Sequence, residues 1–235
     1  MKKTVYISGR MGNQLLRYFI ALADSMENDY EIEAVVVTLH PNFLTEMLDL
    51  KVRAVSQLKA RQSDIHHNVE KNIRMLFKHR GRLLEEGWIK LKMVENFINA
   101  ETCIHLRGGD KKSAPLQWYC NKAKGASGKV CVCTDDIKYG KAFMVRLAEM
   151  GMKRDIVFAS QNYSKDWHTI LGAGEIYCSV STFPLSVLLF DPNKRMIVCS
   201  RRSSTRDFRI DGSREGEFQF VKTAMDYCPN LEFED

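Results

Sequence analysis

The sequence predicts an α/β protein with parallel sheets, and three observations lead to this fold class. Short apolar runs of strand character alternate with segments whose apolar residues recur at helical spacing, through both halves of the chain. Several of these runs are apolar throughout, as in strands that are buried on both faces of a parallel sheet. Loops rich in glycine, hydroxyl and charged residues follow the strands, where open parallel sheets bind ligands. The 235 residues suffice for two lobes, which we expect at residues 1–100 and 101–235.

The chain begins with an expected strand, glycine loop and helix. Residues 4–8 alternate and are rich in β-branched side chains, and apolar residues recur at helical spacing from Leu15 to Met26. The loop at residues 9–14 reads Gly-Arg-Met-Gly-Asn-Gln. It is either a tight turn or an anion site at the N-terminus of the following helix.

The rest of the first half contains weaker signals. Residues 34–39 predict a buried strand, residues 44–48 a short helix and residues 52–55 a further strand. Residues 61–82 are polar and basic, and we interpret the adjacent histidines in this segment as surface residues. A helical stretch over residues 93–98 is expected to lead into the second half.

The stretch at residues 103–111, Cys-Ile-His-Leu-Arg-Gly-Gly-Asp-Lys, has the composition of a phosphate site. A strand ends here in a loop with two glycines, which allow the backbone to approach an anion closely. The fork of Arg107 matches phosphate oxygens, and a charge-assisted contact of this kind is worth about 1.5–3 kcal/mol. A solvated turn after a strand is the alternative interpretation.

A second group of polar residues follows the next expected strand, at residues 130–133. Before it we expect a loop with exposed aromatic residues at 113–119 and a link at 122–129. After it come Asp135 and Asp136, whose carboxylates suit the hydroxyl groups of a sugar or ribose. An N-cap for the following helix is the alternative, and one carboxylate can cap while its neighbour contacts a ligand.

The remaining elements continue the alternation of strands and helices. Strands are expected at residues 155–159 and 195–199, a short strand or turn at residues 176–179, and a helix through Trp167 before that segment. Ser181 and Thr182 precede an apolar helix and could cap it, which would leave free N–H groups facing a phosphate. Residues 201–209 predict a solvated loop or a flap over an anionic ligand, and residues 218–225 predict a closing helix.

The composition indicates what kind of ligand and what cellular compartment to expect. A net charge of +6 and a pI near 8.9 suit an anionic ligand, namely nucleic acid, a phosphorylated metabolite or an acidic membrane surface. No apolar segment is long enough for a transmembrane helix, and no signal peptide is evident, so we expect a cytoplasmic protein. Seven cysteines without paired spacing then indicate reduced thiols, with Cys131 and Cys133 packed in a core. No Cys/His cluster has the spacing of zinc ligands.

Taken in order, these residues resemble the fucosyltransferase superfamily, which groups α-1,2-fucosyltransferases with α-1,6- and protein O-fucosyltransferases. Gly12-Asn13-Gln14 looks like the opening motif of the α-1,2 enzymes, and Gly87-Trp88 stands where they carry a glycine-aromatic pair. Residues 105–110, His-Leu-Arg-Gly-Gly-Asp, match their H-x-R-x-G-D motif. Thr134-Asp135-Asp136 is similar to their acidic pair, and Ser181-Thr182-Phe183 to their S-T-F motif.

The resemblance implies a GT-B-like arrangement of two Rossmann-type lobes with a cleft between them. It also implies an inverting glycosyltransferase that needs no metal or other cofactor and moves a sugar, typically L-fucose from GDP-fucose, to a glycan hydroxyl. The partners are then a nucleotide sugar and a glycan acceptor, with no nucleic acid. The implied donor-binding residues are Gly12, Asn13, Gln14, His105, Arg107, Asp135, Asp136, Ser181, Thr182 and Phe183.

Two residues are the candidates for catalysis. Arg107 would neutralise the charge that builds on the leaving diphosphate, and Asp110 is either the general base or a residue that fixes its own loop. Gly108 stands where the family often has a second arginine, so another nucleotide sugar is an alternative donor. A basic α/β module that binds nucleic acid or a phosphorylated ligand without chemistry is the alternative from a different class.

Overall fold

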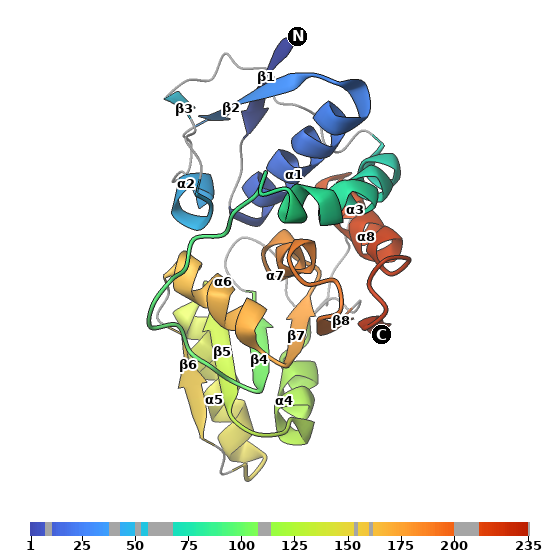
Figure 1. Ribbon diagram of the computed structural model, residues 1–235. Coiled ribbons are helices and arrows are strands. Elements are labelled where there is room, and N and C mark those ends of the chain that lie inside the picture. The colour runs from blue at the N-terminus through green and yellow to red at the C-terminus, as the bar shows by residue number, and fades with distance from the viewer. Residues whose placement is uncertain are drawn as a thin grey trace. The chain divides into compact units, whose positions relative to one another are not determined.

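The chain folds into two compact units, which a computed structural model describes for residues 1–7, 11–37, 43–49, 53–55, 68–107, 114–152, 155–159, 162–199 and 212–234 (Figure 1). Unit 1 consists of Met1–Met93 and Asp211–Tyr227, and unit 2 of Val94–Ile210 and Cys228–Asp235. Each unit contains its own parallel sheet, so the predicted α/β class with parallel sheets is confirmed.

Unit 1 is built on a three-stranded parallel sheet with the order β1-β2-β3. Its strands are β1 (Lys2–Ile7), β2 (Glu31–Val37) and β3 (Arg53–Val55), and its helices are α1 (Met11–Asn28), α2 (Phe43–Met47), α3 (Val69–Glu85) and α8 (Gly212–Ala224). The predicted opening strand and helix are confirmed by β1 and α1. Helix α1 is buried nearly all round from Met11 to Ala23, and it packs against α3. Helix α8 packs on α3, and the Phe77 and Tyr227 rings stack with their centroids 5.2 Å apart.

Unit 2 is built on a six-stranded parallel sheet with the order β6-β5-β4-β7-β8-β9. Its strands are β4 (Thr102–Leu106), β5 (Val130–Thr134), β6 (Ile156–Phe158), β7 (Glu175–Ser179), β8 (Arg195–Cys199) and β9 (Leu231–Glu234), and its helices are α4 (Leu116–Gly125), α5 (Ile137–Glu149), α6 (Tyr163–Gly172), α7 (Thr182–Leu185) and the 3₁₀ helix η1 (Ser186–Leu189). Counted from β4, this is the strand order 3-2-1-4-5-6 of doubly wound nucleotide-binding sheets. The order reverses between β4 and β7.

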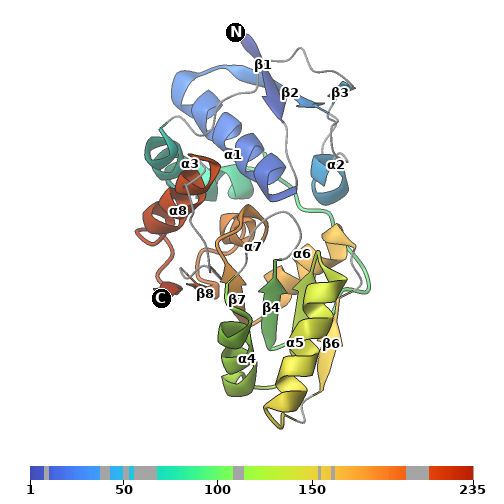
Figure 2. The same ribbon diagram turned by 180° about the vertical axis from the view of Figure 1, so that it is seen from behind.

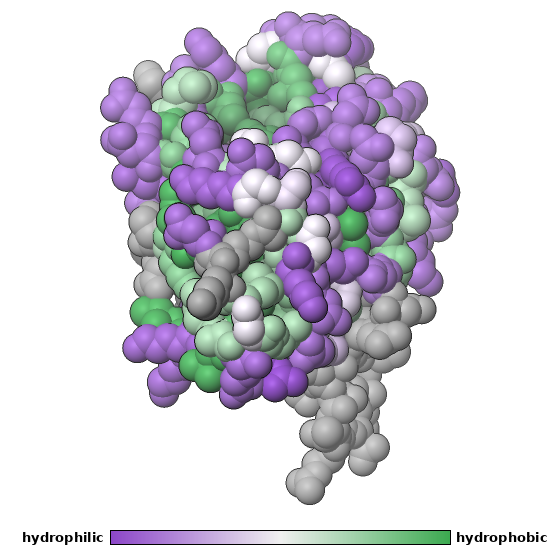
Figure 3. All heavy atoms as spheres, turned by 90° about the horizontal axis from the view of Figure 1, so that it is seen from below, coloured by the Kyte–Doolittle hydropathy of each residue, from purple (hydrophilic) through white to green (hydrophobic). Residues whose placement is uncertain are grey.

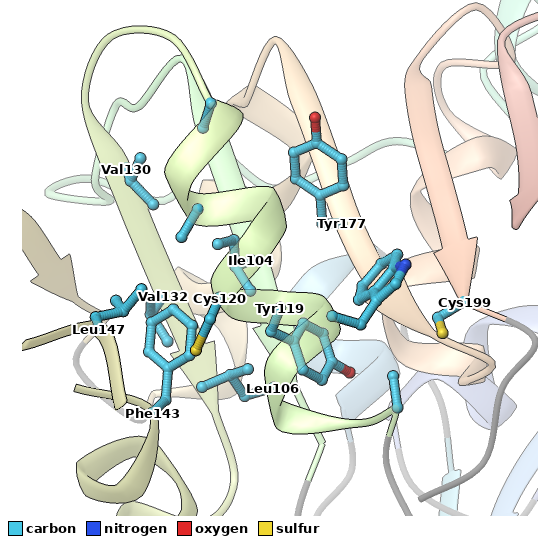
Figure 4. Packing of buried hydrophobic residues seen from close by; sticks show 14 of the residues in the cluster. Ile104, Leu106, Tyr119, Cys120, Val130, Val132, Phe143, Leu147, Tyr177 and Cys199 are labelled. Carbon is cyan, nitrogen blue, oxygen red and sulfur yellow. The ribbon is translucent and has the colours of Figure 1, made fainter. Parts of the chain in front are cut away.

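Helices cover both faces of the six-stranded sheet. Helices α4 and α5 lie on one face and α6 lies on the other, as the two opposite views show (Figures 1 and 2). Under α4 and α5, the hydrophobic core joins side chains of β4, β5 and β7 to Tyr119 and Phe143 (Figure 4). This coverage explains why β4 and β5 are buried along their whole length.

Thiols line part of the other face of this sheet. Cys103 and Cys133 are fully buried on neighbouring strands, and their sulfur atoms lie 3.7 Å apart. The hydrogen bond with the Cys103 thiol, and then burial, raise the pKa of Cys133, and Cys131 is buried on the same strand. The predicted packing of Cys131 and Cys133 in a core is therefore confirmed.

The predicted aromatic loop at residues 113–119 is wrong, because Leu116–Gly125 form α4. Trp118 and Tyr119 are buried, and their ring centroids lie 5.0 Å apart. Pro115 suits the position just before a helix, and Leu116, Tyr119 and Ala123 recur at helical spacing. The predicted link at residues 122–129 accordingly shrinks to the turn after α4.

The predicted helix over residues 93–98 is also wrong. Leu91 pairs antiparallel with Leu48, and Lys92 N donates a hydrogen bond to Met47 O at 2.9 Å, so the segment starts in an extended conformation. Asn96 then adopts a φ of 61°, which does not fit a right-handed helix. The helix of this region is α3. It was not predicted because most of its residues are polar and only Ile73, Leu76 and Leu83 are buried.

The surface of the described residues mixes polar and apolar side chains. On the face seen in Figure 3, hydrophilic residues surround smaller groups of hydrophobic ones. Among the residues with described positions, no helix combines the length and hydropathy needed to cross a membrane.

Candidate functional site

The candidate site of unit 2 lies at the carboxyl ends of β4 and β7. Arg107 directly follows β4, and Ser181 comes two residues after the end of β7. The two strands are neighbours, with Thr102 opposite Glu175 and His105 opposite Cys178. They flank the point where the strand order reverses, and open α/β sheets bind ligands outside this point. Two sequence motifs separated by more than 70 residues are thus brought together.

Arg107 is buried without a negative charge to balance it among the residues described. Only 9% of its surface is exposed. Its Nη1 donates a hydrogen bond to Ser181 Oγ, while its buried Nε has no hydrogen-bond partner in the described part of the chain. A buried, unbalanced cation is costly, and a ligand that supplies anionic oxygens would relieve the cost. The guanidinium has further N–H donors for such a ligand.

His105 lies beside this guanidinium and is neutral. Burial, and then the positive charge of Arg107, lower the pKa of His105 to about 3. Its ring packs against Phe183, with 5.3 Å between the ring centroids. The imidazole therefore adds no charge near Arg107, and it supports the segment after β7 by an aromatic contact.

Local hydrogen bonds hold Ser181 in place. Ser181 is fully buried and caps α7, since its Oγ accepts a hydrogen bond from Phe183 N at 3.4 Å. Ser186 Oγ accepts a hydrogen bond from Trp167 Nε1 at 2.8 Å and donates one to Phe183 O at 2.7 Å. Helix α6 thereby anchors the segment that carries Ser181. The predicted capping role of Ser181 is confirmed, and Thr182 is the first residue of α7.

The two carboxylates after β5 have different surroundings. Asp136 is the N-cap of α5, and its Oδ1 accepts hydrogen bonds from Lys138 N at 2.9 Å and Tyr139 N at 3.2 Å. Asp135 is exposed at the carboxyl end of β5. The N-cap interpretation is therefore confirmed for Asp136, and the prediction that Asp135 contacts a ligand stays a prediction.

In unit 1, the predicted glycine motif belongs to a helix. Gly12, Asn13 and Gln14 lie in the first turn of α1, so the loop expected at residues 9–14 ends before Met11. Gln14 is fully buried, and its Oε1 accepts a hydrogen bond from Phe43 N at 3.1 Å. This bond ties α1 to the start of α2. The prediction that these three residues reach a donor stays a prediction.

Some predicted residues lie outside the described part of the chain. They include Asp110, the candidate general base, and the glycines that precede it. The arginine-rich tail at residues 201–209 and the adjacent histidines of the basic segment also lie outside it.

Sequence reasoning missed two polar residues near this end of the sheet. Asp166, in α6, is buried; its Oδ1 has no hydrogen-bond partner among the described residues, and burial raises its pKa to about 6. Ser164 Oγ, one helical turn away from His168, is likewise buried with no partner in the described ranges. Helical spacing places Asp166 on the same side of α6 as the buried Ile170, and that spacing is the signal that could have revealed it.

The described residues contain no group of three or more His, Cys, Asp or Glu side chains placed to hold a metal ion. The site built above consists of a guanidinium, an imidazole, a hydroxyl group and an exposed carboxylate, all at the carboxyl ends of parallel strands. Such a set can bind an anion and a hydroxylated ligand.

This chain has little similarity to known proteins. No family model matches the sequence, and no curated protein matches it. A crystal structure of a glycosyl transferase family 9 protein from Veillonella parvula DSM 2008 is similar with a TM-score of 0.49 and 9% sequence identity, over 97% of each chain.

Proposed function

We propose that this chain is an inverting glycosyltransferase that holds the diphosphate of a nucleotide sugar at Arg107 and transfers the sugar to a glycan hydroxyl. The single observation that carries the proposal is the buried Arg107 guanidinium, which no described carboxylate balances, at the reversal point of the six-stranded sheet. The sequence resemblance makes GDP-fucose the expected donor. Arg107 and Ser181, which that resemblance assigns to donor binding, are in contact.

To catalyse this reaction, the protein must mainly stabilise the negative charge that develops on the leaving group. The acceptor oxygen attacks the anomeric carbon on the side opposite the phosphate, the bond from that carbon to the phosphate oxygen breaks, and its electron pair leaves with the nucleoside diphosphate. Arg107 would neutralise the charge that develops on that diphosphate, a role in which one preorganised donor is worth about 10²–10³ in rate. The proton of the acceptor hydroxyl goes to a general base, for which Asp110 is the sequence-based candidate.

The other residues would position the donor. Asp135 follows the strand next to β4, where doubly wound sheets bind ribose hydroxyls through a carboxylate. Neutral His105 would leave the cationic charge of Arg107 fully available to the diphosphate. We propose that transfer needs no metal, so chelation with EDTA should leave the rate unchanged.

A small anionic ligand suits this arginine better than a nucleic-acid backbone does. Arginines that contact a duplex backbone reach it from the protein surface, whereas Arg107 is buried at the end of a strand. A non-enzymatic nucleic-acid module would bind DNA or RNA with an affinity that falls steeply with salt concentration. The proposal expects no such binding.

The deciding experiment measures binding and turnover over a panel of donors. We expect GDP to raise the unfolding temperature, by mass action on the folded state, more than UDP, ADP or CDP do. Nucleotide release from GDP-fucose should then exceed release from GDP-mannose and UDP-glucose, and glycan acceptors should raise it further. If another nucleotide stabilises the protein more than GDP does, the donor is a sugar linked to that nucleotide. Absence of any nucleotide effect would refute the enzyme.

A further inference from the structure

Ser179 is the last residue of β7, at the point where the strand order of the six-stranded sheet reverses. The residue before it, Cys178, lies opposite His105, so Ser179 is level with the last residue of β4. Arg107 comes directly after that level, and its partner Ser181 follows Ser179 by two residues. Strand pairing and chain connectivity therefore both place Ser179 next to the anion site.

The hydroxyl group of Ser179 is buried and unused within the described part of the chain. Only 5% of the Ser179 surface is exposed, and its Oγ has no hydrogen-bond partner among the residues with described positions. Thr134, at the end of β5, is also buried, but its Oγ1 donates a hydrogen bond to Asp136 O at 3.2 Å and accepts one from Asp136 N at 3.1 Å. Burying a hydroxyl group without a partner costs free energy of folding, which a ligand that accepts a hydrogen bond would offset.

Ser179 and Arg107 lie on opposite sides of the switch point. Ser179 pairs in register with Cys199, which belongs to the hydrophobic core under α4 and α5, so Ser179 lies on that face of the sheet (Figure 4). The chain after β7 continues to the other face, where α7 and η1 contact α6, and Arg107 bonds to this segment at Ser181. In doubly wound sheets the ligand binds in the crevice between chains that leave on opposite faces. A ligand bound here therefore meets Arg107 on one side and Ser179 on the other.

We propose that the Ser179 hydroxyl group donates a hydrogen bond to the diphosphate of the bound nucleotide sugar, from the side opposite Arg107. The inference rests on the proposed function and adds a donor that lies outside the sequence motifs. A diphosphate suits this pair of groups, because its anionic oxygens point in several directions and accept from a guanidinium and a hydroxyl group together. A hydrogen bond to an anionic oxygen is also stronger than one to a neutral acceptor.

The test compares Ser179→Ala with Cys199→Ala in the whole chain. Ser179→Ala removes the donor and should weaken the binding of both GDP and inorganic pyrophosphate about 10- to 100-fold, the loss expected for one hydrogen bond to a charged acceptor. Cys199→Ala truncates the side chain opposite Ser179, on the same face of the sheet but one strand further from β4. This control should leave both affinities unchanged. Titration calorimetry measures them.

Unfolding of the ligand-free proteins distinguishes a binding role from a structural one. Ser179→Ala should be at least as stable as the wild type, because it removes a buried hydroxyl group that has no described partner. Cys199→Ala should be less stable, because it leaves a cavity in the core. Urea unfolding measures both.

The outcomes separate the inference from the proposed function. Weaker binding of GDP and pyrophosphate by a fully stable Ser179→Ala protein supports the inference. Unchanged affinities overturn it, and a loss for GDP alone overturns it too, because the hydroxyl group would then contact the nucleoside. A destabilised Ser179→Ala protein with weaker binding also overturns it, since the hydroxyl group would then support the fold. A wild type that binds no nucleotide refutes the proposed function and the inference with it, whereas equal GDP binding by wild type and Ser179→Ala refutes the inference alone.

Discussion

The predicted site residues have different structural surroundings in the two units. In unit 2, neighbouring strand ends bring Arg107 and Ser181 together and leave a buried guanidinium nitrogen without a described partner. In unit 1, Gln14 is fully buried in the first turn of α1 and accepts a hydrogen bond from Phe43 N. Motif residues at a switch point thus retain capacity for a ligand, whereas the motif glutamine of unit 1 helps to hold two helices.

The largest expected effect tests the ligand side of this comparison. Arg107→Ala should lower the rate of sugar transfer by about 10²–10³ or more, because it removes the cation that faces the leaving diphosphate. The protein should stay folded, since the variant also removes a buried charge. Initial rates of nucleotide release measure the effect, with Arg107→Lys as the variant that keeps the charge but loses the fork. Wild-type-like turnover in Arg107→Ala would remove Arg107 from the mechanism.

The second effect concerns pH and the buried Asp166. Its pKa is about 6 in the folded protein against 3.8 for the free side chain, so the folded state keeps a proton that the unfolded state loses between these pH values. The contribution of Asp166 to stability therefore falls as pH rises from 4 to 6, to a cost of up to about 3 kcal/mol at neutral pH. Asp166→Asn should remove this cost, which urea unfolding at several pH values measures.

The contribution of His105 to folding stability changes with pH in the opposite direction to that of Asp166, over an overlapping range of pH. Its pKa is about 3 in the folded protein against 6.5 when free, so its contribution to stability rises with pH between these values. The two residues partly cancel in the wild type. We therefore expect unfolding free energy to rise more steeply from pH 4 to 6 in Asp166→Asn than in the wild type. Parallel curves for the two proteins would contradict the raised pKa.

The third effect tests the structural side of the comparison. Gln14→Ala leaves the buried Phe43 N–H without its acceptor, which should cost about 1–3 kcal/mol of unfolding free energy. Chemical denaturation measures the loss. Asn13→Ala, at a half-buried neighbour in the same turn, is the matched control and should cost less. Equal stability of Gln14→Ala and wild type would mean that the bond to Phe43 contributes nothing.

The smallest effect separates the two carboxylates after β5. Asp136→Ala removes the N-cap of α5 and should cost about 0.5–2 kcal/mol of stability. Asp135→Ala should change stability by less than about 0.5 kcal/mol, as at other exposed sites, but should weaken GDP binding. Thermal unfolding with and without GDP measures both properties. If Asp136→Ala weakens GDP binding more than Asp135→Ala, the roles are reversed.

Sequence reasoning predicted the strands well and some connections poorly. The strands β4, β5 and β8 are recognisable because they are buried at nearly every position and consist mostly of apolar and cysteine residues. Helix α3 escaped prediction because only a narrow stripe of it is buried. Strand β9 was not predicted, because it is only four residues long and two of these residues are glutamates that alternate with Leu231 and Phe233.

The candidate site was predictable as residues but not as an arrangement. The composition around Arg107 indicated an anion site without knowledge of its neighbours. Its contact with Ser181 depends on β4 and β7 being adjacent although two other strands lie between them in the sequence, and no local pattern contains that order.

Strand β9 has a consequence for synthesis on the ribosome. It pairs with β8 from Met196 to Cys199, yet the chain first makes α8, which belongs to unit 1. During translation β8 therefore waits with an open edge until α8 and β9 have left the exit tunnel, and such an edge attracts other extended chains. Stalled or shortened translation products of this chain should be held by chaperones or should aggregate through β8.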